Sequence, residues 1–168
     1  MPLFVQTALD FSATEAGLLM LPAGLVLGIT FPIAGRLADR RSARSLVLFG
    51  IGIFALSATL FAVSDVTLAF GWLALWTVLG RIGLGFMLPA LSTGALNPLE
   101  PHELGAGSST INFTRQLGGA FGVNMVALTI EFGEHSAGVP TIGAFHSAWW
   151  LVTVFVAVAA VPVWKMRA

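Results

Sequence analysis

Two arginines, Arg81 and Arg115, lie inside long apolar stretches of the sequence. A guanidinium at the centre of a bilayer costs about 2.5–3.5 kcal/mol on the insertion scale, so it should face protein or water. The chemistry open to each arginine is therefore binding: to backbone carbonyls, to an anionic group, or to water in a polar pathway. A packing role and a place on a substrate or ion pathway both remain open for each.

Arg115 lies on a helical face of small and polar residues. At steps of four, three, four and three, this face reads Ser108, Asn112, Arg115, Gly119 and Gly122. Small residues let a second helix approach closely, and polar residues offer hydrogen bonds to it. Most of these glycines are expected to serve close packing. The corresponding face around Arg81 contains Ala74, Thr77, Gly85 and Ser92. The candidate intramembrane polar or cavity residues are Arg81, Asn112, Arg115, Gly119 and Gly122.

No pattern in the sequence indicates an enzyme. The chain has no cysteine, and its three histidines lie in expected connectors without metal-ligand spacing. Hydrolase, zinc-protease and nucleotide-binding motifs are absent, and no reactive pair lies within an apolar stretch. We therefore predict no catalytic residue, no bound metal and no cofactor.

The composition is that of an integral membrane protein. Hydrophobic residues make up 57% and charged residues only 10%, with a mean hydropathy of +0.90. Soluble domains carry about a quarter charged residues. The formal net charge is zero, so nothing favours a nucleic-acid partner. The partner that the composition predicts is membrane lipid.

Five stretches have the roughly 20 mainly apolar residues that a spanning helix needs. They are about 14–35, 45–63, 67–96, 105–130 and 147–164. None alternates with the two-residue period of a transmembrane strand. The predicted fold is all-α: a single polytopic bundle of about five transmembrane helices, joined by short connectors.

The cations predict how the bundle is oriented. Arg36, Arg40, Arg41 and Arg44 account for half of the eight Lys and Arg residues, and the C-terminal tail adds Lys165 and Arg167. Five spans place all six on one side of the membrane, whereas the other side carries only acids: Asp10, Glu15, Asp65, Glu131 and Glu134. Lys and Arg in short loops mark the cytoplasmic side. We expect a multi-pass cell-membrane protein with its N-terminus outside and its C-terminus in the cytoplasm.

The basic loop resembles a known signature. GRLADRRSARSL is similar to the motif between two helices of the major facilitator superfamily: Gly35, Leu37, Asp39 and Arg40 match, and Arg44 fills a basic position. Ser42 replaces the second glycine. The order of PLFVQTALDFSATEAGLLMLPAG, this loop, GRIGLGFMLPALSTGAL and GAGSSTINFTRQLGGAFGV resembles the C-terminal part of fourteen-helix drug:proton antiporters.

This resemblance implies a partial C-terminal half of a major facilitator fold, in which PLFVQ ends the preceding helix. It implies export by alternating access, with a small-molecule substrate and protons as partners. Asp39 and Arg40 would latch two helical bundles by capping a neighbouring helix or pairing with charges. The missing N-terminal transporter half would be a further partner, and the fragment alone would be inactive.

One alternative stays open from the residues themselves. The chain could be a non-transporting polytopic subunit or an assembly factor. No Asp or Glu lies deep in any expected span, so a proton-carrying carboxylate is not expected in this segment.

Overall fold

The computed structural model describes residues 6, 12–64, 69–135 and 142–165, and all secondary structure in this part of the chain is helical. The helices are α2 (Ala13–Ala38), α3 (Ala43–Ala62), α4 (Phe70–Leu96), α5 (Leu104–His135) and α6 (Ile142–Trp164). Each predicted span overlaps one of these helices, which confirms the all-α prediction. The expected start of the third span at residue 67 and the segment at residues 2–5 lie outside the described residues.

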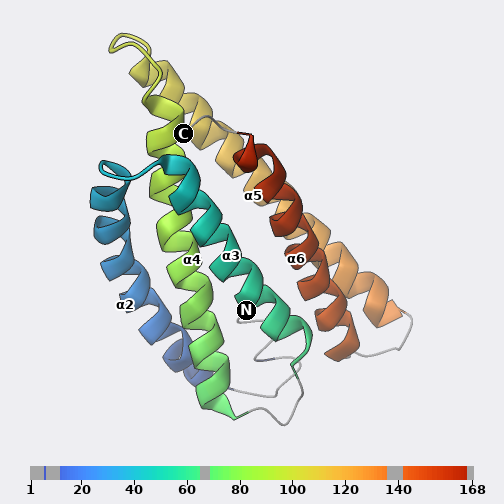
Figure 1. Ribbon diagram of the computed structural model, residues 1–168. Coiled ribbons are helices and arrows are strands. Elements are labelled where there is room, and N and C mark those ends of the chain that lie inside the picture. The colour runs from blue at the N-terminus through green and yellow to red at the C-terminus, as the bar shows by residue number, and fades with distance from the viewer. Residues whose placement is uncertain (1–5, 7–11, 65–68, 136–141, 166–168) are drawn as a thin grey trace.

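The helices run side by side and reverse direction at each connector (Figure 1). α4 packs extensively against α2 and α3, while α6 packs against α3 and, less closely, α5. α5 contacts α4 only slightly. The result is a well-packed group of α2, α3 and α4, and a looser pair of α5 and α6 attached through α3.

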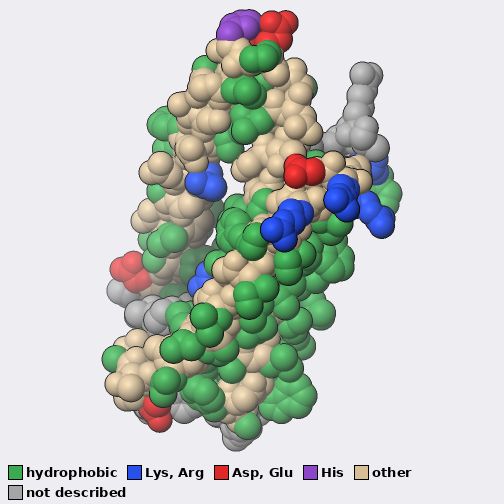
Figure 2. Space-filling view, turned by 90° about the vertical axis from the view of Figure 1, so that its left-hand side faces the viewer, with side chains coloured by type: hydrophobic (Ala, Val, Ile, Leu, Met, Phe, Trp, Pro, Cys, Tyr) green, Lys and Arg blue, Asp and Glu red, His purple; other side chains and the backbone are tan. Residues whose placement is uncertain are grey.

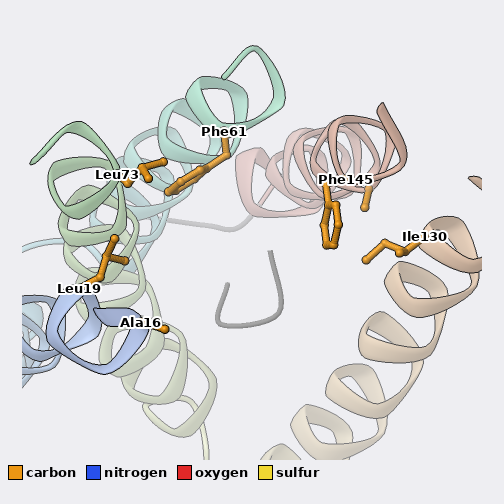
Figure 3. Close-up of a cluster of buried hydrophobic side chains, with 7 residues drawn as sticks. Ala16, Leu19, Phe61, Leu73, Ile130 and Phe145 are labelled. Atoms are coloured by element: carbon orange, nitrogen blue, oxygen red, sulfur yellow. The ribbon is translucent and has the colours of Figure 1, made fainter. Parts of the chain in front are cut away.

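Buried apolar clusters tie the helices together at both ends. One joins the starts of α2, α4 and α6 to the ends of α3 and α5; its buried residues are Ala16, Leu19, Phe61, Leu73, Ile130, Phe145 and Ala148. In Figure 3, Leu73 and Phe61 lie together on one side, and Phe145 and Ile130 lie on the other. The other cluster joins the opposite ends and contains Ala38, Leu46, Val47, Ile51, Ala90 and Val163. Together these clusters hold an up-and-down bundle, in which consecutive helices run in opposite directions.

Local sequence explains where α2 and α3 begin. Ser12 caps α2: its hydroxyl accepts from the Glu15 backbone N–H, and Glu15 accepts from the Ser12 backbone in return. This reciprocal arrangement is a capping box. Ser42 caps α3 by accepting from the Ser45 backbone N–H at 3.3 Å. The serine that departs from the family motif therefore has a structural role, because it starts the next helix.

Glycines bring α3 and α4 into backbone contact. A Cβ on Gly83 would lie 2.7 Å from the Gly50 carbonyl oxygen, and one on Gly50 would lie 2.6 Å from the Gly83 carbonyl oxygen. The Ser57 hydroxyl adds a 2.7 Å hydrogen bond to the Trp76 carbonyl oxygen across the same interface. Close approach of small residues is how helices pack where water supplies no hydrophobic force.

By length and apolarity, α2, α3, α4 and residues 143–164 of α6 could each cross a membrane. α5 is long enough, but Gly, Ser, Thr and Asn are spread along it, and it falls short in apolarity. The fourth predicted span, residues 105–130, is thus a helix of different character, and its polar residues belong to the candidate site.

Candidate functional site

Arg81 lies about 16 Å along α4, counting 1.5 Å per residue from Phe70. It is half-buried and lines a cavity of about 210 Å³ together with Ser57, Thr77 and Trp149. No described residue forms an ion pair or a side-chain hydrogen bond with it. The Thr77 hydroxyl instead donates to the Leu73 carbonyl within α4 at 2.7 Å. The arrangement offers an unpaired cation, in a small cavity with an aromatic wall, to an anion or to water.

The small and polar residues expected on one face around Arg81 do not all meet the same neighbouring helix. Gly85 is buried against α2, where an added Cβ would lie 2.6 Å from the Thr30 methyl group. Thr77 and Arg81 instead face the cavity shared with α3 and α6. Gly85 therefore serves packing, and Arg81 remains the polar candidate on α4.

Arg115 and Asn112 on α5 form a pair. Arg115 Nη2 donates to Asn112 Oδ1 at 2.7 Å, and both side chains are exposed on the outside of the described helices. Residues three apart are neighbours on a helix surface, so the sequence spacing already contained this contact. Arg115 lies about 16 Å from the start of this 32-residue helix.

Gly119 and Gly122 do not pack closely against a helix in this structure. A Cβ on either would meet nothing within 4 Å. Both line an apolar hollow of about 840 Å³, whose walls are mainly α5 and α6, with Phe54 and Leu84 contributed by α3 and α4. Long apolar side chains of α5 stand exposed beside it, among them Phe121 at 70%. Close-packed glycines lie elsewhere in the described helices, among them Gly50, Gly83 and Gly85, and the sequence pattern does not distinguish them from the rest.

The basic loop lies at the shared end of α2, α3 and α6. Asp39 is the C-cap residue of α2, and Arg40 follows it in the turn. Both line a hollow of about 390 Å³ together with Leu37. No described residue pairs with the Asp39 carboxylate or the Arg40 guanidinium, so the latching role that the resemblance implies remains a prediction. Gly35 is half-buried, with open space around it.

Aromatic contacts that the sequence did not suggest surround these sites. Phe61 stacks on Trp149 with ring centroids 4.8 Å apart and meets Trp76 edge-on at 5.5 Å. The Arg44 guanidinium lies 5.6 Å from the Trp164 ring centroid, a cation–π contact between the start of α3 and the end of α6. Aromatic residues far apart in sequence give no signal of such pairing.

The placement of His146 in a connector is wrong. His146 lies inside α6 and is half-buried, and its Nε2 atom is buried without a hydrogen-bond partner. His102 does lie in the turn before α5, exposed and 3.4 Å from Glu100. In the part of the chain that the structure describes, no three metal-binding side chains come together.

The sequence profile of the Major Facilitator Superfamily matches residues 1–167. The chain belongs to this superfamily. It is therefore a multi-pass membrane protein, as its apolar helices indicate, and the family predicted from the basic loop and the order of motifs is confirmed.

Several relatives are drug-resistance proteins. The chain is 34% identical over 146 residues to the multidrug resistance protein B homolog of Mycobacterium tuberculosis, covering 84% of this chain and 27% of the relative. It is 36% identical over 146 residues to the lincomycin resistance protein LmrB of Listeria monocytogenes, with 84% and 30% covered. The uncharacterized MFS-type transporter YcnB of Bacillus subtilis is 28% identical over 142 residues, again with 84% and 30% covered.

The chain thus spans less than a third of the length of these relatives. No solved structure matches it.

Proposed function

We propose that this chain is the C-terminal bundle of a proton-coupled exporter of drugs or other small molecules, working by alternating access. Its relatives are a lincomycin resistance protein and a multidrug resistance protein homolog, and its family is that of transporters. Each of these relatives is more than three times as long as the matched segment. On this proposal the chain alone does not transport, because a central cavity needs walls from both halves of the protein.

The observation that carries the proposal is the uncovered face of α5. Asn112 and Arg115 point away from the other described helices, at a depth where lipid would surround them. An arginine in that position must face protein or water. A water-filled cavity completed by the rest of a transporter supplies both.

The hollow beside α5 supports the same proposal. Its walls, which include Gly119, Gly122 and Phe121, are almost wholly apolar. α4 packs closely against both α2 and α3. Among the described helices, α6 packs against α3, but α5 makes only slight contact with α4 and none comparable with α2 or α3. We infer that a further transmembrane helix of the complete transporter occupies this hollow.

The candidate residues divide into two roles on this proposal. Arg81 and Arg115 supply positive charge to the transport pathway, and Arg81 is the one without a protein partner among the described side chains. Asp39 and Arg40 latch the two halves at the cytoplasmic end. No carboxylate lies near the middle of a described helix, so the proton-carrying acid belongs to the other half.

The test measures lincomycin accumulation in cells that lack their own drug exporters. The chain alone is expected to leave accumulation unchanged, and the chain extended by its upstream coding sequence is expected to lower it. In the extended form, Arg81→Ala and Asp39→Asn are expected to abolish this effect at normal membrane levels. Reduced accumulation with the short chain alone would reject the proposal that it needs a second half.

A different outcome would favour the alternative reading. If no transmembrane sequence precedes the chain in frame, and the short chain co-purifies with another membrane protein, it is a subunit or assembly factor rather than part of an exporter. Loss of protein, rather than of transport, in Arg81→Ala would assign Arg81 to packing.

A further inference from the structure

Cations from three elements converge at one end of the bundle. Arg36, Arg40 and Arg41 come from the end of α2 and the following turn, Arg44 lies at the start of α3, and Lys165 follows α6. The buried cluster that includes Ala38, Leu46 and Val163 holds these three ends together. Figure 2 shows several Lys and Arg side chains gathered around a single acidic group.

This basic end is poorly neutralised. In the α2–α3 turn and at the end of α6, the described carboxylate is Asp39, set against Arg36, Arg40, Arg41 and Lys165. Glu100 and Glu103 lie at the same end of the bundle, on the separate turn before α5. Arg36, Arg40, Arg41 and Lys165 are exposed, and no described residue forms an ion pair with any of them. A concentration of unpaired charge at the end of a membrane bundle attracts anionic lipid headgroups.

A hollow at the end of α6 has the residues expected of a lipid-binding site. Its volume is about 240 Å³, and it is lined by Ala160 and Val161 on the membrane side and by Trp164 and Lys165 at the end. The apolar lining suits an acyl chain, and the ammonium group suits a phosphate. Val158 and Val161 are both more than half exposed, so the apolar surface extends along α6.

Arg44 contacts one of the residues that line this hollow, Trp164. Its guanidinium is 5.6 Å from the centroid of the Trp164 ring, which places two cations, Arg44 and Lys165, around one tryptophan. Tryptophan favours the headgroup level of a bilayer. An arginine guanidinium also matches the geometry of a phosphate.

We propose that this hollow binds an anionic phospholipid, with the phosphate held by Arg44 and Lys165 and an acyl chain lying along Ala160 and Val161. The proposal concerns the leaflet that the basic end faces, whichever it is, and it does not depend on transport. Diffuse attraction by the basic end as a whole is the competing explanation.

The test is native mass spectrometry of the purified, delipidated 168-residue chain, titrated with phosphatidylglycerol or with phosphatidylcholine of the same acyl chains. At about 1 kcal/mol per cation, binding of phosphatidylglycerol should weaken about fivefold in Lys165→Gln and about thirtyfold in Arg44→Gln with Lys165→Gln. Binding of phosphatidylcholine should be weak and unchanged. Equal binding of the two lipids by the unmodified chain would overturn the proposal without recourse to any variant.

The matched control is Arg36→Gln with Arg41→Gln, which removes two cations from the same end but none from the hollow or from beside Trp164. This variant is expected to lose less than about threefold. If this control lost as much affinity for phosphatidylglycerol as the Arg44 and Lys165 variant, the attraction would be diffuse and a defined lipid-binding site would be rejected. A competition experiment with soluble glycerol phosphate distinguishes a lipid site from a site for free phosphate esters. Displacement of the lipid by glycerol phosphate at equal concentration would show that the site binds free phosphate esters and would reject the lipid.

Discussion

At the scale of single residues, the two intramembrane arginines differ in how they are satisfied. Arg115 has a protein partner in Asn112, whereas Arg81 has none among the described residues and faces a small cavity. An arginine retained without a partner is a cost to stability. Residues of this kind are expected where function, and not packing, sets the requirement.

Replacing Arg81 by leucine should therefore stabilise the chain and, on the proposed function, remove transport from the complete protein. Leucine is favourable and arginine unfavourable at a helix centre, with a difference of about 3 kcal/mol on the insertion scale. The expected result is a rise of several degrees in the apparent Tm in detergent, measured by tryptophan fluorescence. Arg81→Lys, which keeps the charge, is the control and should not raise it. A lower Tm in Arg81→Leu would show that the guanidinium contributes to packing.

At the scale of the helices, glycine has opposite roles on α4 and α5. Gly83 lets the α4 backbone touch α3, whereas Gly119 and Gly122 face an open hollow. A side chain is thus excluded at Gly83 but meets no described atom at Gly119 and Gly122. Two experiments separate these roles.

Gly83→Ala should destabilise the α3–α4 pair by about 1–3 kcal/mol, because the new methyl group would lie 2.7 Å from the Gly50 carbonyl oxygen and the backbones must move apart. The measurement is the apparent Tm in detergent. Gly52→Ala is the matched control: Gly52 lies on α3, is exposed and has nothing within 4 Å of a Cβ. That variant should be neutral or slightly more stable, since alanine favours helix by about 1 kcal/mol. Equal effects in the two variants would argue against the close approach.

Gly122→Leu should leave the Tm of the 168-residue chain unchanged, because the side chain enters open space. On the proposed function, the same substitution in the complete transporter should lower either its membrane level or its rate of export, since a further helix would fill the hollow there. Unchanged export in the complete protein would place the hollow against lipid.

At the scale of the whole molecule, the up-and-down topology places residues 39–44, the turn at 97–103 and Lys165 at one end of the bundle. Ala69, which precedes α4, lies at the opposite end with the starts of α2 and α6. These ends carry different charge, and the inside–outside orientation is our proposal from that difference.

The native chain has no cysteine, so single cysteines report orientation directly. A membrane-impermeant maleimide applied to intact cells should label Ala69→Cys, and it should label Ser42→Cys only after the membrane is opened. His102→Cys should behave as Ser42→Cys does. Labelling of Ser42→Cys and Ala69→Cys from the same compartment would contradict the up-and-down topology. Labelling of Ser42→Cys in intact cells, and of Ala69→Cys only in opened ones, would contradict the orientation alone.

Much of this architecture could be predicted from residue order. Apolar runs located every helix, and the Arg115–Asn112 contact follows from a spacing of three. Helix ends were less accurate: α2 continues through Arg36 to Ala38, and α5 runs to His135 instead of ending near residue 130. A long cationic side chain can extend from the last turn to the polar layer, so an arginine does not end a spanning helix.

Partners between helices could not be predicted. The sequence has 19 glycines, and nothing in their local pattern distinguishes Gly83, which touches α3, from Gly119, which touches nothing described. The cavity at Arg81 depends on Trp149, 68 positions away in the chain. Such contacts depend on which helices become neighbours, and local periodicity carries no information about that.

The backbone contact at Gly50 and Gly83, reinforced by the Ser57–Trp76 hydrogen bond, has a consequence for motion. α3 and α4 form a rigid unit, whereas α5 is joined to it through few contacts. In heavy water, amide hydrogens near residues 50 and 83 should persist long after those near residue 115 have exchanged for deuterium. The expected site of flexing in the isolated chain is therefore the attachment of α5.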